Sequence, residues 1–286
     1  MADTRRLIFR AAWWTTNVLF GAAILCLVYS GFREYSVRRY LDGFSDAIVP
    51  NALPALPKVE AILRWMRLEP SRATTEHPDD LRHRDPLMTL NYAQLLNVCG
   101  TATNAFLNLA RSSDLQVRRL LLLDGHRSTK HVVAEVLIDG KWIVVDPTYR
   151  LIMRDASGRM LTRRDLQNAE LFAQATAAAP GYPAEYSYER FARVRITRLP
   201  MVGLGLRRAL DWVIPSWEDK ADWSLLLERE SFFFLFASAM ATLAMLLARA
   251  ALAWIADRRL HLPRFGLRKY FRRAGVALFS APEMHQ

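Results

Sequence analysis

The chain has 286 residues, of which 52% are hydrophobic and 23% charged, and its formal net charge is +11. This length suits one ordinary domain with additional segments, or two small domains. The two cysteines, Cys26 and Cys99, fall in segments that we expect to be separated in space, so no disulfide is predicted.

Residues 11–32 form the first predicted element. They are 22 consecutive residues without a charge, and a helix needs about 20 apolar residues to cross a bilayer. A buried core helix rarely runs so long without a polar face. A cleavable signal peptide is disfavoured because the run is long and no small-x-small cleavage site follows it. We therefore predict a cytoplasmic N-terminus over residues 1–10 and an uncleaved transmembrane helix over residues 11–32.

Residues 33–91 combine mixed charges with scattered prolines. This composition predicts an extracytoplasmic connector that contains local helices, one of them over residues 58–68. No role for the connector can be derived from its residues.

The pattern becomes regular from residue 92, and we predict a folded domain over residues 92–200. Residues 98–110 carry apolar side chains at helical spacing, and residues 115–123 are typical of a strand. Two β-rich runs follow, and the dipeptide Asp139-Gly140 between them is a strong signal for a two-residue hairpin.

The register of this hairpin brings a histidine and a carboxylate together. If Ile138 pairs with Lys141 across the turn, side chains alternate faces along both strands. His131 and Asp146 then become diagonal neighbours on one face, with backbones about 7 to 8 Å apart. A carboxylate there can hold the imidazole in one tautomer and stabilise its protonated form. Glu135 lies on the same face, where it is a solvated or paired charge.

Cys99 stands at the first turn of the predicted helix over residues 98–110. Helix N-terminal amides favour anions and lower the pKa of a thiol, and a nearby imidazolium lowers it further. The thiolate is the nucleophilic form. A backbone amide near Cys99 can stabilise an oxyanion, and Gln94 is a candidate second donor.

The elements beyond the hairpin are less regular. Thr162 is a candidate N-cap for a helix that ends near residue 177, and residues 190–199 indicate another strand. A second connector over residues 201–230 leads to a second apolar run, residues 231–256, with 18 uncharged residues before Arg249. We predict that this run is a transmembrane helix, with Arg249 near enough to one end to reach the interface.

Charges at the ends of the chain predict its orientation. The last segment, residues 257–286, has seven basic residues and two acidic ones, and the first ten residues are also basic. Because basic flanks remain in the cytoplasm, we expect both termini inside and residues 33–230 outside. This outer segment carries only +3 of the net charge, so the basic excess marks topology and contact with lipids rather than nucleic-acid binding. Arginine outnumbers lysine by 34 to 5, a bias that points to a GC-rich bacterium and hence to its inner membrane.

The run from His131 to Thr148 resembles the His-to-Asp hairpin of the transglutaminase-like superfamily. The segment around Cys99 is similar to the cysteine helix of that family, and Arg118 falls at an arginine position of its next strand. Asp114 and Gln116 depart from the usual glycine and proline. The positions of the hairpin that match are His131, Glu135, Gly140, Trp142, Asp146, Pro147 and Thr148.

This resemblance implies an α+β fold in which the cysteine helix packs on an antiparallel sheet, here between two transmembrane helices. It also implies acyl chemistry with Cys99 as nucleophile, His131 as proton donor and Asp146 as the orienting carboxylate. We expect a cysteine peptidase or amidase that needs no cofactor or metal and acts on an envelope protein, peptide or cell-wall substrate. The oligomeric state is open.

Three alternatives to a hydrolase stay open. The first is a protein-crosslinking acyltransferase, and the second is a non-catalytic scaffold that retains the fold. The third is a metal site that uses Cys99, His131 and a carboxylate, but it lacks a second Cys or His at short ligand spacing.

Overall fold

The computed structural model describes residues 2–68, 73–126, 128–193 and 224–260, with isolated positions between residues 205 and 214. The chain divides into two compact units. One comprises Met1–Tyr29 with Ala237–Gln286, and the other comprises Ser30–Phe236.

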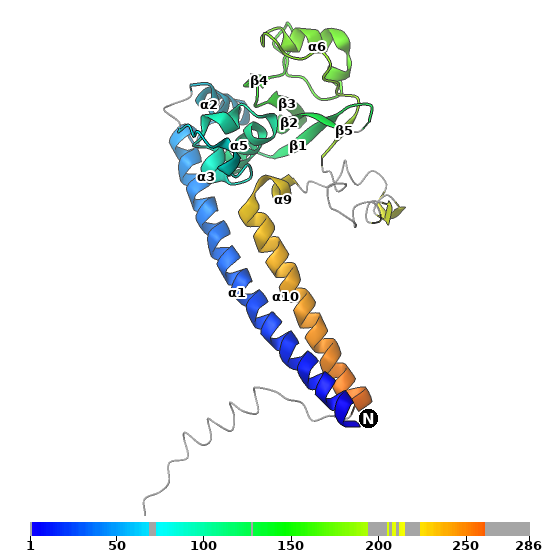
Figure 1. Cartoon of the computed structure of the whole chain (residues 1–286). Helices are drawn as coiled ribbons and strands as arrows, with labels where there is room; N and C mark the ends of the chain where they lie inside the picture. The colour runs from blue at the N-terminus through cyan, green and yellow to red at the C-terminus, as the bar shows by residue number, and fades with distance from the viewer. Residues whose placement is uncertain are drawn as a thin grey trace, which may run out of the picture. The chain divides into compact units, whose positions relative to one another are not determined.

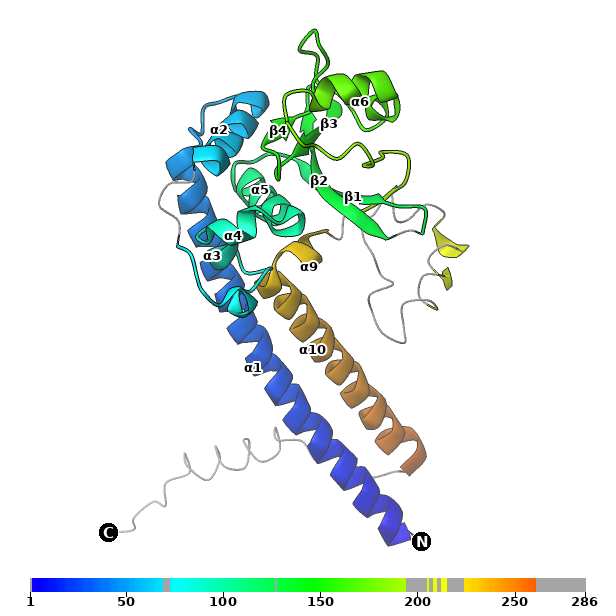
Figure 2. The same ribbon diagram turned by 45° about the horizontal axis from the view of Figure 1, so that its top comes forward.

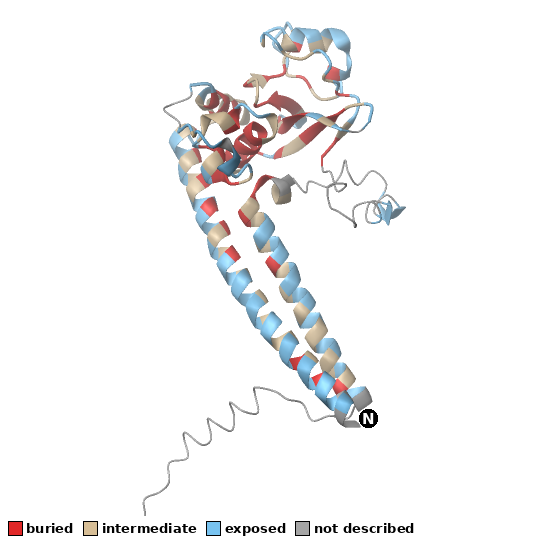
Figure 3. Cartoon of the chain, in the orientation of Figure 1, coloured by how far each residue is buried: buried red, intermediate tan, exposed pale blue. Residues whose placement is uncertain are grey.

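The first unit contains the N-terminal part of one long helix and most of another. Helix α1 covers Ala2–Ile48 and helix α10 covers Glu230–Ile255, followed by a short π-helical turn over Ala256–Leu260. Both are long and apolar enough to cross a membrane, and only 6% of the most apolar window of each is buried. Figure 3 shows pale blue, exposed residues along both helices. The two candidate membrane-spanning helices agree with the prediction, and neither is a buried core helix.

The ends of these helices contact each other within the first unit. Phe9 and Trp13 of α1 form a buried cluster with Ala256. The guanidinium of Arg249 lies over the rings of Trp13 and Phe20, at 5.6 and 5.7 Å from their centroids. Cation–π contacts of this kind stabilise a charged side chain in apolar surroundings.

The second unit is a five-stranded antiparallel sheet with helices packed on it (Figure 1). Its strand order is β4-β3-β2-β1-β5, and every neighbouring pair is antiparallel. The expected α+β fold with an antiparallel sheet is therefore confirmed. The strands are β1 (Val117–Leu123), β2 (Thr129–Ile138), β3 (Lys141–Asp146), β4 (Leu151–Ile152) and β5 (Phe191–Ala192).

The turn between β2 and β3 has the predicted type and register. Asp139 and Gly140 have φ angles of 47° and 75°, so both occupy the left-handed region that a type I′ turn requires. Ile138 pairs with Lys141, and the register continues without a slip to Ala134 and its partner on β3. The alternation of faces deduced from the sequence follows from this register.

The hydrophobic core lies between the sheet and helix α5, which covers Cys99–Ser112 (Figure 2). Phe106 of α5 and Val136 of β2 are fully buried there. The same core includes Leu41 of α1 and Ile62 of α2 (Ala55–Leu68). It thus extends to residues before position 92, where the sequence predicted only a connector. Four more short helices among the described residues are η1 (Pro78–Asp80), α3 (Pro86–Thr89), α4 (Ala93–Leu96) and α9 (Ser224–Glu228).

A buried polar cluster joins α1 to the start of α10 within the second unit. Glu34, only 2% exposed, accepts a hydrogen bond from Ser231 Oγ at 2.8 Å and lies 3.3 Å from Arg229 Nη1. Arg38, one turn along α1, pairs with the same carboxylate at 2.8 Å. Glu228 of α9 is fully shielded and pairs with Arg111 of α5. We call Glu34, Arg38, Arg229 and Ser231 the Glu34 cluster.

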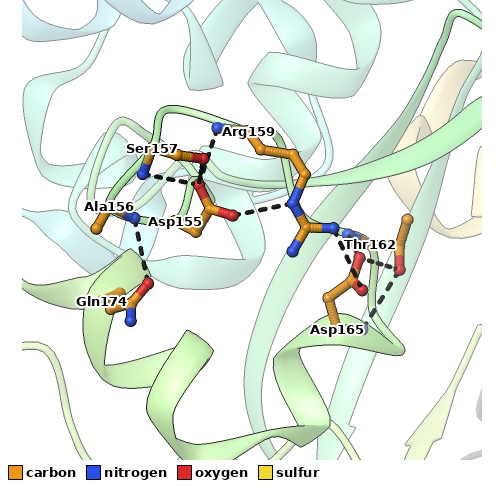
Figure 4. A network of polar contacts seen from close by, with 7 residues as sticks. All are labelled: Asp155, Ala156, Ser157, Arg159, Thr162, Asp165 and Gln174. Carbon is orange, nitrogen blue, oxygen red and sulfur yellow. Dashed lines mark hydrogen bonds and ion pairs between the residues drawn. The ribbon is translucent and has the colours of Figure 1, made fainter.

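The segment after β4 is organised by two aspartates (Figure 4). Asp155 accepts hydrogen bonds from the backbone N–H groups of Ser157 and Arg159 and pairs with the Arg159 guanidinium at 2.9 Å. Asp165 accepts from the backbone and the hydroxyl of Thr162. These bonds fix the loop that precedes helix α6.

Helix α6 covers Ala169–Thr176 and follows the 3-10 turn η2 (Asp165–Gln167). The prediction of Thr162 as its N-cap is wrong. Asn168 caps the helix, with its Oδ1 accepting from the N–H groups of Glu170 and Leu171, because the 3-10 turn separates Thr162 from the helix. Of the strand predicted over residues 190–199, the structure describes only residues 190–193.

Candidate active site

Cys99 is the first residue of α5. Its side chain is half-buried and packs against Leu121 and Val132 of the sheet. The first four amides of a helix have no partner inside it, and their dipoles favour an anion. The backbone N–H groups of Val132 and Gly100 contribute to lowering the pKa of the Cys99 thiol, so the local backbone favours a thiolate.

His131 connects Cys99 to Asp146. It lies on β2 and is only 2% exposed. Its Nε2 is 2.7 Å from Asp146 Oδ2, so the diagonal contact deduced from the hairpin register exists. The other ring nitrogen, Nδ1, is then the one available to interact with the side chain of Cys99. The structure thus brings all three predicted residues into one chain of contacts.

The ionisation of this pair favours separated charges. The hydrogen bond from His131 lowers the pKa of the Cys99 thiol, against the opposing effect of burial. Burial acts to lower the pKa of His131, but the hydrogen bonds to Asp146 and Cys99 outweigh it and raise the pKa to about 9. Both shifts favour a thiolate beside an imidazolium.

Asp146 is completely buried and all its hydrogen-bond partners are donors. Oδ1 accepts from the backbone N–H groups of Thr148 and Tyr149, at 3.0 and 3.3 Å. Oδ2 accepts from His131 and from the hydroxyl of Tyr182, the latter at 2.9 Å. These bonds satisfy both oxygens of the carboxylate and fix its plane.

Three tyrosines surround the imidazole, and the sequence analysis did not find them. Tyr186 stacks on His131 with centroids 4.4 Å apart and planes within 8°. Tyr149 and Tyr182 approach the ring edge-on, at 6.0 and 6.3 Å. For Tyr182 and Tyr186 the available signal was the concentration of tyrosine at positions 182, 186 and 188.

Gln94, the predicted second oxyanion donor, is engaged elsewhere. Its Nε2 donates to the carbonyl of Thr75 at 2.8 Å and its Oε1 accepts from the N–H of Thr75 at 3.4 Å. This pair of bonds ties α4 to the segment before it. A contribution of Gln94 to an oxyanion site stays a prediction.

Within the part of the chain that the structure describes, no three His, Cys, Asp or Glu residues are grouped to hold a metal ion.

Glu135 is a buried member of an ion-pair network on the histidine face. Its Oε2 is 2.7 Å from Arg118 Nε and 3.0 Å from Arg193 Nη1. The Arg118 guanidinium also lies 3.8 Å from the centroid of the Trp142 ring. The interpretation of Glu135 as a paired charge is correct, and this network connects β1, β2 and β3.

Comparison with known families agrees with this geometry. Residues 42–147 match the family model described as the transglutaminase-like superfamily. This part of the chain is a transglutaminase-like domain, and it contains Cys99, His131 and Asp146. The matched residues begin in α1 and include α2, in accord with the core described above. No curated protein and no solved structure matches the chain.

Proposed function

We propose that this protein is a membrane-anchored cysteine hydrolase, a peptidase or an amidase, that acts on an extracytoplasmic amide substrate. The observation that supports it most directly is the contact chain from Cys99 through His131 to Asp146, within a transglutaminase-like domain. This superfamily is consistent with hydrolase or acyltransferase chemistry, and here all three polar residues of that chemistry are retained.

The proposed reaction has two steps. The Cys99 thiolate attacks the substrate carbonyl, and the imidazolium of His131 gives its proton to the leaving amine as the C–N bond breaks. The resulting thioester is attacked by water, whose proton returns to His131, and the acid product leaves with Cys99 again as a thiolate. Asp146 keeps Nε2 of His131 occupied, so that Nδ1 stays directed at the sulfur and at the leaving group.

The two candidate membrane-spanning helices support a location at the membrane. We infer a two-pass inner-membrane protein of a bacterium, with both termini in the cytoplasm and the domain outside. Most of the basic tail on which this orientation rests, residues 261–286, lies outside the described residues. A domain held in this way would reach envelope proteins, peptides and cell-wall stem peptides.

Two other functions are compatible with the same fold. An amine in place of water would make the protein a crosslinking acyltransferase. A non-catalytic scaffold would have no need for a thiol, an imidazole and a carboxylate in hydrogen-bonding contact, and their retention argues against it.

The test is covalent labelling of the full chain in detergent with an amide-mimicking electrophile, followed by mass spectrometry of the adduct. We expect the adduct on Cys99 and loss of labelling in Cys99→Ala. Cys26→Ser, which removes the other thiol, is the matched control and should label normally. Incubation with envelope extract should trap an acyl group on Cys99, and its mass would identify the substrate. If Cys99→Ala retains amide hydrolysis, the hydrolase proposal is wrong.

A further inference from the structure

A groove rich in arginine lies between α2 and the edge strand β4. Its volume is about 330 Å³, which is within the usual size of a small-molecule site. Arg64 and Arg67 of α2 line one side, and Arg150 and Arg154, on either side of β4, line the other. We call it the arginine groove.

The charge balance of the arginine groove strongly favours an anion. Four guanidinium groups face one carboxylate, that of Glu60, which pairs with Arg154 at 2.7 Å. That pair is about 40% exposed on both sides, so it is weak and a bound anion can compete with it. Arg64 is exposed and has no polar partner among the described residues.

The groove is a built structure rather than a chance gathering of surface charges. Leu63 and Ile152, both nearly buried, are part of its lining and pack in the core beneath it. The Arg67 guanidinium donates to the carbonyl of Arg150 at 2.7 Å, which joins α2 to the segment before β4. Arg150 itself is 91% buried, with a φ of 53° that is uncommon outside glycine. The Arg150 guanidinium donates to the carbonyl of Thr148 and to Asn97 Oδ1, the latter at 3.4 Å. Arg67 and Arg150 are therefore held in place before any ligand arrives.

The number of donors selects the class of anion. One carboxylate is saturated by a single guanidinium fork, whereas a phosphate dianion offers oxygens to several forks at once. Arg64 and Arg67 are both exposed and pair with no carboxylate among the described residues, and Arg154 adds a third guanidinium when its exposed pair with Glu60 opens. These groups suit a phosphate monoester or diphosphate. We propose that the arginine groove is a binding site for a phosphate group, carried either by a soluble compound or by a lipid headgroup.

This binding requires none of the chemistry proposed for Cys99. The test is titration calorimetry with pyrophosphate as the probe, using the full chain in uncharged phosphatidylcholine nanodiscs and phosphate-free buffer. We expect binding to the wild type and at least a roughly 10-fold higher Kd in Arg64→Gln and in Arg64→Gln/Arg67→Gln. Arg164→Gln removes an exposed arginine outside the groove and should bind as the wild type does. Cys99→Ala should also bind normally, so failure of the hydrolase proposal would be distinguishable.

Changing the lipid of the nanodiscs distinguishes a lipid headgroup from a soluble phosphate compound as the ligand. If phosphatidic acid in the discs raises the Kd for pyrophosphate while an equal charge of oleate does not, the groove binds a lipid headgroup. If neither lipid raises it, the groove binds a soluble phosphate compound. The proposal is overturned if pyrophosphate does not bind, if Arg64→Gln and Arg164→Gln bind equally, or if tricarballylate binds more tightly than pyrophosphate. Arg64→Gln alone decides the matter should the double variant not fold, because Arg64 has no described polar contact to lose.

Discussion

At the scale of single residues, Asp146 is held by four donors on its two oxygens. Asparagine has nearly the same size but replaces one acceptor oxygen with an amine donor. Turned one way, this amide NH2 group would face the backbone N–H groups of Thr148 and Tyr149, which can only donate; turned the other way, it would displace the hydrogen bonds that His131 and Tyr182 donate. The donors around Asp146 therefore require two acceptor oxygens, and a side chain of the same shape is not sufficient.

We expect Asp146→Asn to reduce turnover of an amide substrate by about 10- to 10³-fold, since the imidazolium loses its charged partner. It should also lower the free energy of unfolding by roughly 1 to 3 kcal/mol, because buried donors are left unsatisfied. Turnover and urea unfolding should be measured on the same preparation. Glu135→Gln is a poor control because it breaks the pairs with Arg118 and Arg193. An Asp146→Asn enzyme with normal turnover would remove Asp146 from the mechanism.

The contribution of Tyr182 can be isolated by removing only its hydroxyl. Tyr182→Phe deletes the hydrogen bond to Asp146 Oδ2 and keeps the ring beside His131. We expect kcat to fall by about 10-fold, the equivalent of one hydrogen bond to a charged group, with KM unchanged. Tyr186→Phe retains the ring that stacks on His131 and removes a hydroxyl with no described hydrogen bond, so it should be near normal. Equal loss in both variants would contradict a positioning role for the Tyr182 hydroxyl.

The pKa values of Cys99 and His131 predict the pH range of reactivity. The thiolate–imidazolium pair exists above the lowered pKa of Cys99 and below the raised pKa of His131, about 9. Turnover should therefore fall as pH rises through about 9, when His131 loses its proton, and fall again at acid pH when the thiolate is protonated. Alkylation of Cys99 by iodoacetamide should already be substantial at pH 7, and His131→Ala should shift it to higher pH. An ordinary thiol titration in both proteins would exclude the ion pair.

At the scale of elements, the β2–β3 hairpin and the Glu34 cluster show two different ways of fixing position. The hairpin is specified by a local turn, because Asp139 and Gly140 adopt positive φ angles that set the register of both strands. The Glu34 cluster joins residues almost 200 positions apart. Its stability depends on burial, because Arg229 is 6% exposed and Glu34 is 2% exposed.

We expect Glu34→Ala to destabilise the second unit by about 3 to 5 kcal/mol, because it leaves the buried Arg229 guanidinium without its carboxylate. Glu60→Ala breaks a pair that is about 40% exposed and should cost no more than about 1 kcal/mol. Thermal unfolding of the full chain in detergent, followed by circular dichroism, compares the two. Similar melting temperatures for both variants would show that the Glu34 cluster contributes little.

At the scale of the whole molecule, the two candidate membrane-spanning helices and the charges of the termini predict topology. Reporter fusions should place both ends of the chain in the cytoplasm and the turn at Asp139 outside. Alkaline phosphatase inserted at Asp139 should be active, whereas a fusion after Gln286 should be inactive. An active fusion after Gln286 would reverse the proposed orientation.

The sequence by itself determined the features that depend on local pattern. Uninterrupted apolar runs indicated the candidate membrane spans, a two-residue turn set the hairpin register, and that register placed His131 beside Asp146. The position of Cys99 at a helix start was equally readable. These inferences hold because side-chain direction repeats with a known period along a strand or helix.

Only the tertiary structure decided which distant residues meet. The hydroxyl of Tyr182 reaches Asp146 from 36 positions away, and Ile62 lies in the core although its segment looked like a connector. The α2 residues Arg64 and Arg67 face Arg150 across the arginine groove. No periodicity encodes such contacts, because they arise from packing between elements whose separation in the chain is long. The physical reason is that local sequence fixes the direction of a side chain, while the free energy of burial and pairing selects the partner it meets.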